Sequence, residues 1–329
     1  MKQNPIAATV DFSHDGVQHG FLRLPYSRDD SAWGSVNIPV TVAKNGTGPT
    51  ALLTGANHGD EYEGPVALMD LAHTIDSRRL NGRVIIVPAM NFPAFRAGTR
   101  TSPIDRGNLN RSFPGRPDGS VTEKIADYFQ RTLLPLADFI LDIHSGGRTL
   151  EFLPFACSHH LPDAKYEARC LAAAEAFGAP YVLMLREIDS VGMYDTAAEA
   201  QGRIFVSTEL GGGGHSTAHT NAIAKRGVRN FLIHSGILQD KPAVSKSIKL
   251  AMPSSDCFVF SEDDGLLEMV VDLGSPVKSG DVVAKIWPSD RTGRDPVVYR
   301  AKMDGLLVGR HFPGLVKSGD CMAVLATNS

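Results

Sequence analysis

Short apolar segments alternate with segments of helical periodicity between residues 50 and 240, and this alternation restricts the possible folds most. The apolar segments lack polar alternation, which is typical of strands buried on both faces, and none approaches the ~20 residues of a membrane span. Strands alternating with helices predict an α/β fold with a mixed, mostly parallel sheet flanked by helices. We expect strands at 50–54, 84–89, 139–143 and 203–209, and helices at 64–74, 122–136, 163–178 and 220–238.

A region of different composition begins after residues 241–247, where short strands and Gly/Asp turns replace the helical pattern. It contains a weak internal repeat, GSPVKSGD at 274–281 and GLVKSGD at 314–320. We therefore predict an α/β domain over residues 1–245 and a small all-β domain of two similar halves over 246–329. The repeat resembles the half-barrels of biotinyl and lipoyl domains. The hairpin between its halves, PSDRTGRDP, lacks their modified lysine, so we do not expect a carrier function.

The charge balance argues against some classes of partner. The 33 Lys and Arg residues and 36 Asp and Glu residues give a net charge of −3, without the basic excess of a nucleic-acid-binding protein. The same balance provides no attraction to an anionic membrane surface. The N-terminus shows no apolar signal segment, and the cysteines form no CxxC motif, so we expect a cytoplasmic protein with reduced thiols. The sequence does not decide between a monomer and a homo-oligomer. The cysteines are Cys157, Cys170, Cys257 and Cys321.

The motif His58-Gly59-Asp60-Glu61 directly follows the expected strand at 50–54. A histidine nitrogen and a carboxylate oxygen are both zinc ligands, and side chains three residues apart at the start of a helix can point at one position. The end of a buried strand is also where α/β proteins place their chemistry. In the alternative interpretation, Glu61 caps a helix and His58 is an ordinary loop histidine.

A third zinc ligand is expected from another strand end, and His144 follows the segment 139–143 directly. Side chains alternate along a strand, so Asp142 is expected on the same side as His144. We interpret Asp142 as a carboxylate that supports the ligands and does not itself bind the metal.

Two further motifs follow this pattern. Asn110 and Arg111 lie in an ordered polar loop, where an amide and a guanidinium can hold a carboxylate; alternatively, Arg111 ties down its own loop. Glu209 ends the strand at 203–209 and precedes Gly211–Gly214, which permit a close backbone approach to a substrate. The alternative for Glu209 is a simple strand-ending turn.

The order and content of these motifs resemble the succinylglutamate desuccinylase/aspartoacylase family, a branch of the zinc carboxypeptidase superfamily, over roughly residues 50–240. The resemblance implies a zinc-carboxypeptidase-like fold with one Zn²⁺ per chain. It also assigns a role to each residue matched to a family motif. These are His58, Glu61 and His144 as zinc ligands, Asn110 and Arg111 as ligands of the substrate carboxylate, and Glu209 as general acid and base.

The chain departs from the family pattern at one position. The family usually has an aspartate that orients a zinc histidine where this chain has Asn108, so the support of that ligand is in question, whereas the ligand set is not. Family members also use an arginine just upstream of this loop. Arg106 and Arg100 are both candidates for that substrate-binding role.

The resemblance implies a zinc-dependent amidohydrolase acting on a small N-acylated amino acid. The segments DGVQHGFLRLPYSRDDSAWGS and LLTGANHGDEYEGPVAL are most similar to members that deacetylate N-α-acetyl-L-2,4-diaminobutyrate in ectoine degradation. That substrate carries a distal ammonium, and the acidic segment 185–195 is either its pocket or a solvated loop. Aspartoacylase- or desuccinylase-type deacylation, a zinc carboxypeptidase and a catalytically silent binding protein remain alternatives. We expect His159 and His160 on an exposed loop and His215 at the rim of the site.

Overall fold

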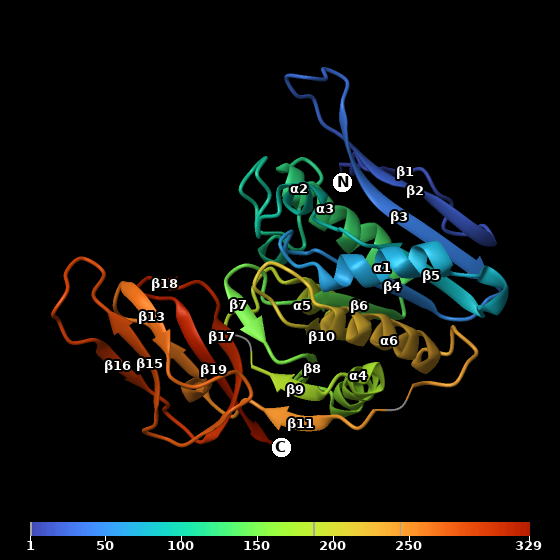
Figure 1. Ribbon diagram of the computed structural model, residues 1–329. Helices are drawn as coiled ribbons and strands as arrows, with labels where there is room; N and C mark the ends of the chain where they lie inside the picture. Colours follow the sequence, from blue (N-terminus) through green and yellow to red (C-terminus); the bar gives the residue numbers. More distant parts are fainter. Residues whose placement is uncertain (1, 187, 244) are drawn as a thin grey trace.

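The computed structural model describes residues 2–186, 188–243 and 245–329, and its main element is one large mixed sheet (Figure 1). In spatial order the strands of this sheet are β1 (Ala7–Ala8), β2 (Gly16–Pro25), β3 (Ser35–Asn45), β5 (Gly82–Val87), β4 (Thr50–Gly55), β6 (Phe139–His144), β10 (Ile204–Glu209), β8 (Phe155–His159), β9 (Tyr181–Leu185), β11 (Ile248–Ala251), β19 (Cys321–Asn328), β17 (Gly305–His311) and β14 (Pro276–Val277). Two short strands lie beside this path, β12 (Phe258–Phe260) against β19 and β7 (Leu150–Phe152) against β17.

The four central strands β5, β4, β6 and β10 are parallel, while β2 and β3 are antiparallel to their neighbours and β8 is antiparallel to β10. The predicted mixed, mostly parallel sheet is thus confirmed for the core of the molecule. The strands predicted at 50–54, 84–89, 139–143 and 203–209 correspond to β4, β5, β6 and β10.

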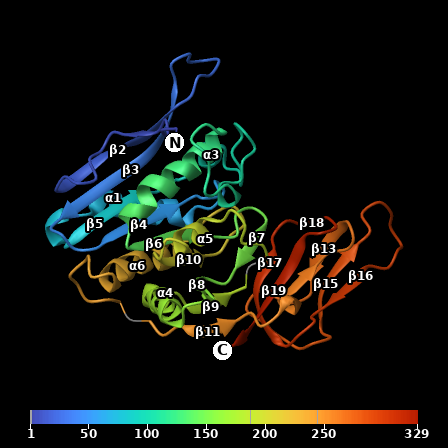
Figure 2. The ribbon, with the colours of Figure 1, turned by 180° about the vertical axis from the view of Figure 1, so that it is seen from behind.

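Helices cover both faces of the sheet (Figures 1 and 2). One hydrophobic core lies under α1, α4 and α6, and a second core lies under α3 and α5 on the opposite face. The helices are α1 (Glu63–Thr74), α2 (Phe92–Ala97), α3 (Val121–Tyr128), α4 (Ala164–Phe177), α5 (Tyr194–Glu199) and α6 (Ala218–His234).

The helix predicted at 122–136 is regular only in its first half. After α3 the chain continues as a π-helical segment (Phe129–Leu133) and a 3₁₀ turn (Leu134–Leu136). Pro135 explains this change, because proline lacks an N–H donor and its ring clashes with the carbonyl of the preceding turn. Within the described residues, no helix is long and apolar enough to cross a membrane.

The C-terminal region forms a separate four-stranded sheet that packs against β17 and β19 (Figure 2). The predicted repeat is confirmed in its backbone. The N–H of Lys278 donates to Asp281 Oδ2 at 2.8 Å, and the N–H of Lys317 donates to Asp320 Oδ2 at 2.9 Å. The strands of this sheet are β16 (Val297–Arg300), β15 (Val282–Trp287), β13 (Gly265–Met269) and β18 (Leu315–Val316).

The boundary near residue 245 stays a prediction. The large sheet continues past it, because β11 pairs with β9 on one side and with β19 on the other.

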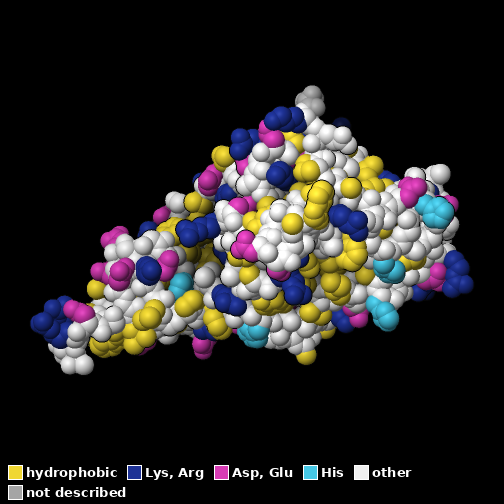
Figure 3. Space-filling view, turned by 90° about the horizontal axis from the view of Figure 1, so that it is seen from above, with side chains coloured by type: hydrophobic (Ala, Val, Ile, Leu, Met, Phe, Trp, Pro, Cys, Tyr) yellow, Lys and Arg dark blue, Asp and Glu magenta, His cyan; other side chains and the backbone are white. Residues whose placement is uncertain are grey.

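On the face of the molecule shown in Figure 3, Lys and Arg side chains are mixed with Asp and Glu side chains.

Candidate metal centre

The site lies where the parallel strands β4, β6 and β10 end at one edge of the sheet, which is the edge where α/β proteins place their ligands. The loop between β4 and α1 carries His58 and Glu61, and His144 is the last residue of β6. Glu209, the last residue of β10, is the register partner of His144. Partners in a parallel pair point to the same side of the sheet, so the fold directs Glu209 and His144 into the same space.

His58, Glu61 and His144 converge on one point and are all buried. Their ligand atoms lie within 4.8 Å of one another. Glu61 Oε1 is 2.7 Å from His58 Nδ1, and Glu61 Oε2 is 2.9 Å from His144 Nδ1. Two imidazole nitrogens and one carboxylate form the donor set of a catalytic zinc site that keeps one position open. The residues present therefore fit zinc.

Asp142 supports His144 from behind. Asp142 Oδ2 lies 2.7 Å from His144 Nε2, so the two side chains share one side of β6 as predicted. Thr54 Oγ1 and Asn57 Nδ2 donate to Asp142 at 2.7 and 3.0 Å and fix its orientation. Because the carboxylate only accepts, it holds the proton on Nε2, which directs Nδ1 toward the metal position.

Burial and charge act in opposite directions on these groups. Burial alone would lower the pKa of His144, but the charges of Asp142 and Glu61 outweigh it and hold this pKa well above its usual value. Burial would likewise raise the pKa of Glu61, and the two histidines instead hold it well below its usual value. The pKa of His58 is lowered, first by burial and then by the charge of Arg100 against the attraction of Glu61. The cluster is therefore organised around an ionised Glu61.

The Asn108 side chain forms no hydrogen bond with His58. Its Oδ1 accepts a hydrogen bond from the N–H of Asn110 at 3.1 Å and so caps the short 3₁₀ helix Leu109–Arg111. The buried His58 Nε2 has no hydrogen-bond partner among the described residues. This chain has Asn108 where the family usually has an aspartate, and the Nε2 of His58 has no carboxylate of the described residues beside it to accept its proton.

Glu209 is partly buried, and its Oε2 is shielded from solvent without a hydrogen-bond partner in the described part of the chain. Burial, followed by the charge of Glu61, raises the pKa of Glu209 to about 8. A carboxyl group with a pKa near neutral pH can both accept and return a proton. The geometry and the titration of Glu209 suit the predicted acid and base.

Arg100, and not Arg106, lies beside this cluster. The Arg100 guanidinium is 3.8 Å from Glu61 Oε1, and its charge acts on the pKa of His58 and of Glu209. Arg106 is exposed six residues further along the same loop, where its backbone has a positive φ of 56°. The structure therefore favours Arg100 of the two candidates.

Asn110 and Arg111 are adjacent but differently placed. Asn110 is buried, and its Oδ1 accepts from the N–H of Tyr194 at 3.0 Å, which leaves the Nδ2 donor as its group for a ligand. Arg111 is exposed, and its Nη1 donates to the carbonyl of Asn110 at 2.7 Å, so it bonds to its own loop here. Their role toward a substrate carboxylate stays a prediction.

Sequence reasoning missed Glu63, the first residue of α1. Glu63 is buried beside the cluster, accepts from Thr220 Oγ1 at 3.1 Å, and has a pKa raised by burial to about 7. The sequence carried no signal for it, because an acidic residue in the first turn of a helix is ordinarily stabilised by the helix N-terminus.

The acidic segment 185–195 does not present all its carboxylates to the site. Glu187 lies outside the described residues, and Asp189 is exposed. Asp195 is buried near His159, with Oδ2 4.0 Å from Nε2.

The expectation of an exposed loop was wrong for His159, which ends the buried strand β8 and pairs with Glu199 at 2.9 Å.

Of the other two histidines, His160 was predicted to be exposed and His215 to lie at the rim of the site, and the second of these stays a prediction. His160 is exposed, as expected. His215 lies on the segment after the glycine run, where its ring faces Phe312 with the centroids 6.3 Å apart.

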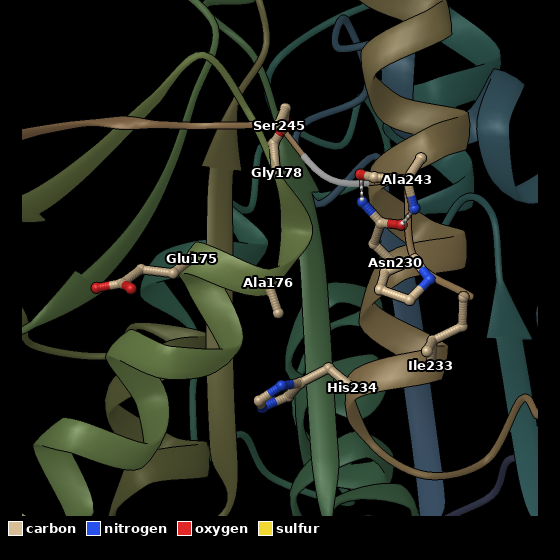
Figure 4. A pocket seen from close by; sticks show the side chains of 9 residues that line it. Glu175, Ala176, Gly178, Asn230, Ile233, His234, Ala243 and Ser245 are labelled. Atoms are coloured by element: carbon tan, nitrogen blue, oxygen red, sulfur yellow. Dashed lines mark hydrogen bonds between the residues drawn. The ribbon is translucent and has the colours of Figure 1, made fainter. Parts of the chain in front are cut away.

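A groove between the C-terminal ends of α4 and α6 is a further cavity (Figure 4). Asn230 projects into it, but its amide both donates to and accepts from the backbone of Ala243, at 3.0 and 2.9 Å. Glu209 lies beyond the opposite end of α6. The groove therefore reflects the packing of the linker and is separate from the metal centre.

Comparison with known proteins agrees with this geometry. The family model of the succinylglutamate desuccinylase/aspartoacylase catalytic domain matches residues 47–235. The N-alpha-acetyl-L-2,4-diaminobutyric acid deacetylase of Halomonas elongata is 58% identical over 99% of this chain and 96% of its own length.

Solved structures resemble the whole chain. A product-bound structure of the ectoine utilization protein EutE (DoeB) from Ruegeria pomeroyi is 65% identical, with a TM-score of 0.98 over 99% of this chain and 100% of that one. A structure described as a succinylglutamate desuccinylase, from Silicibacter sp. TM1040, is 64% identical with a TM-score of 0.97 over 100% of both chains.

Proposed function

The chain belongs to the succinylglutamate desuccinylase/aspartoacylase family and hydrolyses an amide bond, and from this premise we propose that it deacetylates N-α-acetyl-L-2,4-diaminobutyrate. The products are L-2,4-diaminobutyrate and acetate. The observation that carries this substrate is the 58% identity, along 99% of the chain, to the Halomonas elongata deacetylase. The likeness to a protein named for ectoine utilization supports a place in ectoine degradation.

We propose that one zinc ion per chain is held by His58, Glu61 and His144. Zinc bound by such a donor set lowers the pKa of water to about 7 and polarises a carbonyl group. Asp142 fixes the tautomer and orientation of His144, so the ligand nitrogen faces the metal position without rearrangement. The buried surroundings of the three ligands strengthen their interaction with a cation.

Glu209 moves the proton in this proposal. Its carboxylate accepts a proton from the attacking water and returns it to the nitrogen of the leaving amine. A pKa raised to about 8 supports the second step, since a carboxyl group that holds its proton near neutral pH is an effective donor. Arg100, 3.8 Å from Glu61, is the cation placed to stabilise negative charge that develops on the acyl oxygen.

The Nδ2 of Asn110 and the guanidinium of Arg111 are proposed to bind the substrate carboxylate. For Arg111 this requires the side chain to leave the carbonyl of Asn110. For the role of the arginine upstream of this loop, Arg106 is the second choice behind Arg100. The cysteines form no disulfide within the described residues, and this supports a reducing, cytoplasmic location.

Amine release from a panel of substrates tests the proposal, with zinc determined on the same protein sample. The panel contains N-α-acetyl- and N-γ-acetyl-diaminobutyrate, N-acetylaspartate, N-succinylglutamate and a blocked dipeptide. We expect turnover of the first compound, with loss of turnover after chelation and restoration by added zinc. Arg100→Ala and Arg106→Ala both remove an exposed arginine from the same loop region, and comparing their turnover decides between the two candidates.

Each other outcome selects an alternative. Turnover of N-acetylaspartate or N-succinylglutamate instead would assign an aspartoacylase- or desuccinylase-type activity to the same site. Cleavage of the blocked dipeptide would indicate a carboxypeptidase. A protein that binds no zinc and cleaves nothing would be a binding protein.

A further inference from the structure

The C-terminal β-domain reaches the segment that carries Glu209 through the short strand β7 (Leu150–Phe152). On one edge, β7 pairs antiparallel with β17 of the β-domain, where Arg310 is the register partner of Glu151. On its other edge, β7 contacts the glycine run Gly211–Gly214, which begins two residues after Glu209. One strand therefore separates the β-domain from the proposed proton-transfer group.

Backbone hydrogen bonds join β7 to the glycine run. The N–H of Phe152 donates to the carbonyl of Gly211 at 3.0 Å, and the N–H of Gly213 donates to the carbonyl of Leu150 at 3.0 Å. The turn before β7 adds the bond from the N–H of Gly214 to the carbonyl of Gly147, at 2.6 Å. The glycine run thus takes its shape largely from β7 and the turn that precedes it.

The glycine run depends on such external support. All four glycines have positive φ, between 69° and 150°, in a region that other residues rarely adopt, and glycine loses the most conformational entropy on ordering. A Cβ on Gly212 would lie 2.0 Å from the carbonyl oxygen of Leu150, and one on Gly213 would lie 2.7 Å from the Phe312 ring. The glycine run has no side chains of its own to hold it in place, so it depends on the contacts that β7 and the β-domain provide.

Arg310 and Glu151 form the side-chain link across the β7–β17 edge. Arg310 Nε and Nη2 both donate to Glu151 Oε2, at 2.8 and 2.6 Å. The two side chains are 31% and 27% exposed, so water only partly screens the pair. Glu151 itself bridges Gly212 through the backbone, so the pair acts on the residue that touches the glycine run.

We propose that Arg310 is a positioning residue for the amide hydrolysis: its pair with Glu151 holds β17 against β7, and β7 holds the glycine run that sets the position of the Glu209 carboxylate. This inference rests on the proposed function only in taking Glu209 as the proton-transfer group. It gives the β-domain a part in proton transfer.

The test compares Arg310→Ala with Lys285→Ala. Lys285 and Glu268 form a cross-strand pair at 3.3 Å within the β-domain, with 33% and 42% exposure, and are a close match for the Arg310–Glu151 pair. Arg310→Ala should lower kcat about tenfold while KM stays within about twofold, because a misplaced proton-transfer group slows the chemical step. Zinc content should not change. Lys285→Ala should leave all three quantities at the wild-type values.

Amide hydrogen exchange of residues 210–214 in the metal-free protein provides a readout independent of activity. Arg310→Ala should speed this exchange about tenfold, and the charge-swapped double variant Glu151→Arg/Arg310→Glu should restore both the exchange protection and most of kcat. If Arg310→Ala does not fold, Arg310→Lys and Glu151→Gln replace it.

Three outcomes would overturn the inference: exchange and kcat both within twofold of the wild type, an effect on KM alone, or an equal effect of Lys285→Ala. A wild-type protein without amidase activity would contradict the proposed function, and the exchange measurement would still decide whether the link orders the glycine run.

Discussion

The parallel core and the C-terminal β-domain contribute to the site in different ways. Strands β4, β5 and β6 are buried along almost their whole length, so each position is held by side-chain packing. Strands β13 and β16 of the β-domain leave most of their side chains partly or fully exposed. The core supplies the reactive side chains at the strand ends, while the β-domain reaches them through backbone pairing at β7 and β17.

The two regions should therefore respond differently to substitution. Changes at the core strand ends should act on the chemistry directly. Changes in the β-domain should act on the chemistry only where they touch the β7–β17 edge.

The largest effect is expected for His144→Ala. It removes a proposed ligand and the imidazole that lies between the buried carboxylates of Asp142 and Glu61. We expect no measurable turnover and loss of bound zinc in elemental analysis. The control is His215→Ala, which removes an exposed histidine that is not one of the three converging residues. Zinc retained at the wild-type level in His144→Ala would contradict the ligand assignment.

Glu209→Gln should lower kcat by about a thousandfold, since positioned acid–base groups contribute 10²–10⁴. Zinc content should stay unchanged, because Glu209 is the register partner of His144 and is not itself one of the converging ligands. Steady-state kinetics and elemental analysis of the same preparation check both points. A variant with kcat within tenfold of the wild type would assign the proton transfer to another group, and Glu63 would be the first candidate.

Asp142→Asn should have a smaller effect, because it keeps the shape and removes only the charge behind His144. Loss of a supporting partner typically costs about 10–100-fold in metal affinity. Competition with a chromophoric zinc chelator measures this change. The matched control is Asp60→Asn, at a buried aspartate whose side chain accepts from the backbone N–H of Arg148 and forms no hydrogen bond with the three ligands. Equal losses in the two variants would mean that the effect comes from folding.

The sequence predicted the parts of the site that strand ends control by themselves. His58, Glu61, His144 and Glu209 each follow an apolar segment whose burial is evident from its composition, and parallel strands bring these ends together. Asp142 followed from the two-residue repeat of side chains along a strand. These residues were predictable because local pattern and fold agree.

The remaining parts depend on tertiary contacts that no local pattern shows. The strand β8 was missed because its sequence, FACSH, mixes polar and apolar residues. These residues are buried because β8 lies inside the large sheet, between β10 and β9. For the same reason His159 was expected on an exposed loop. The choice between Arg100 and Arg106 depends on the path of the loop after α2, which brings Arg100 to Glu61. Glu151 and Arg310 are 159 residues apart in the chain, so only the β7–β17 pairing brings them into contact.

The smallest effect concerns stability against pH in the metal-free protein. The pKa of Glu209 is raised to about 8, compared with ~4.3 for an unfolded glutamate, so the folded state binds more protons between these values. Stability from this group is therefore present below about pH 4 and is lost as the pH rises through 8. Glu209→Gln removes the dependence, so its melting temperature relative to the wild type should increase by a few degrees from pH 5 to pH 8. Thermal unfolding in chelator at several pH values measures it. His144 and Glu63, whose pKa values are also raised, act in the same direction in the wild type. If the melting temperatures of the two proteins change with pH in parallel, Glu209 is already ionised in the folded state at pH 5, and this strand end does not make stability depend on pH.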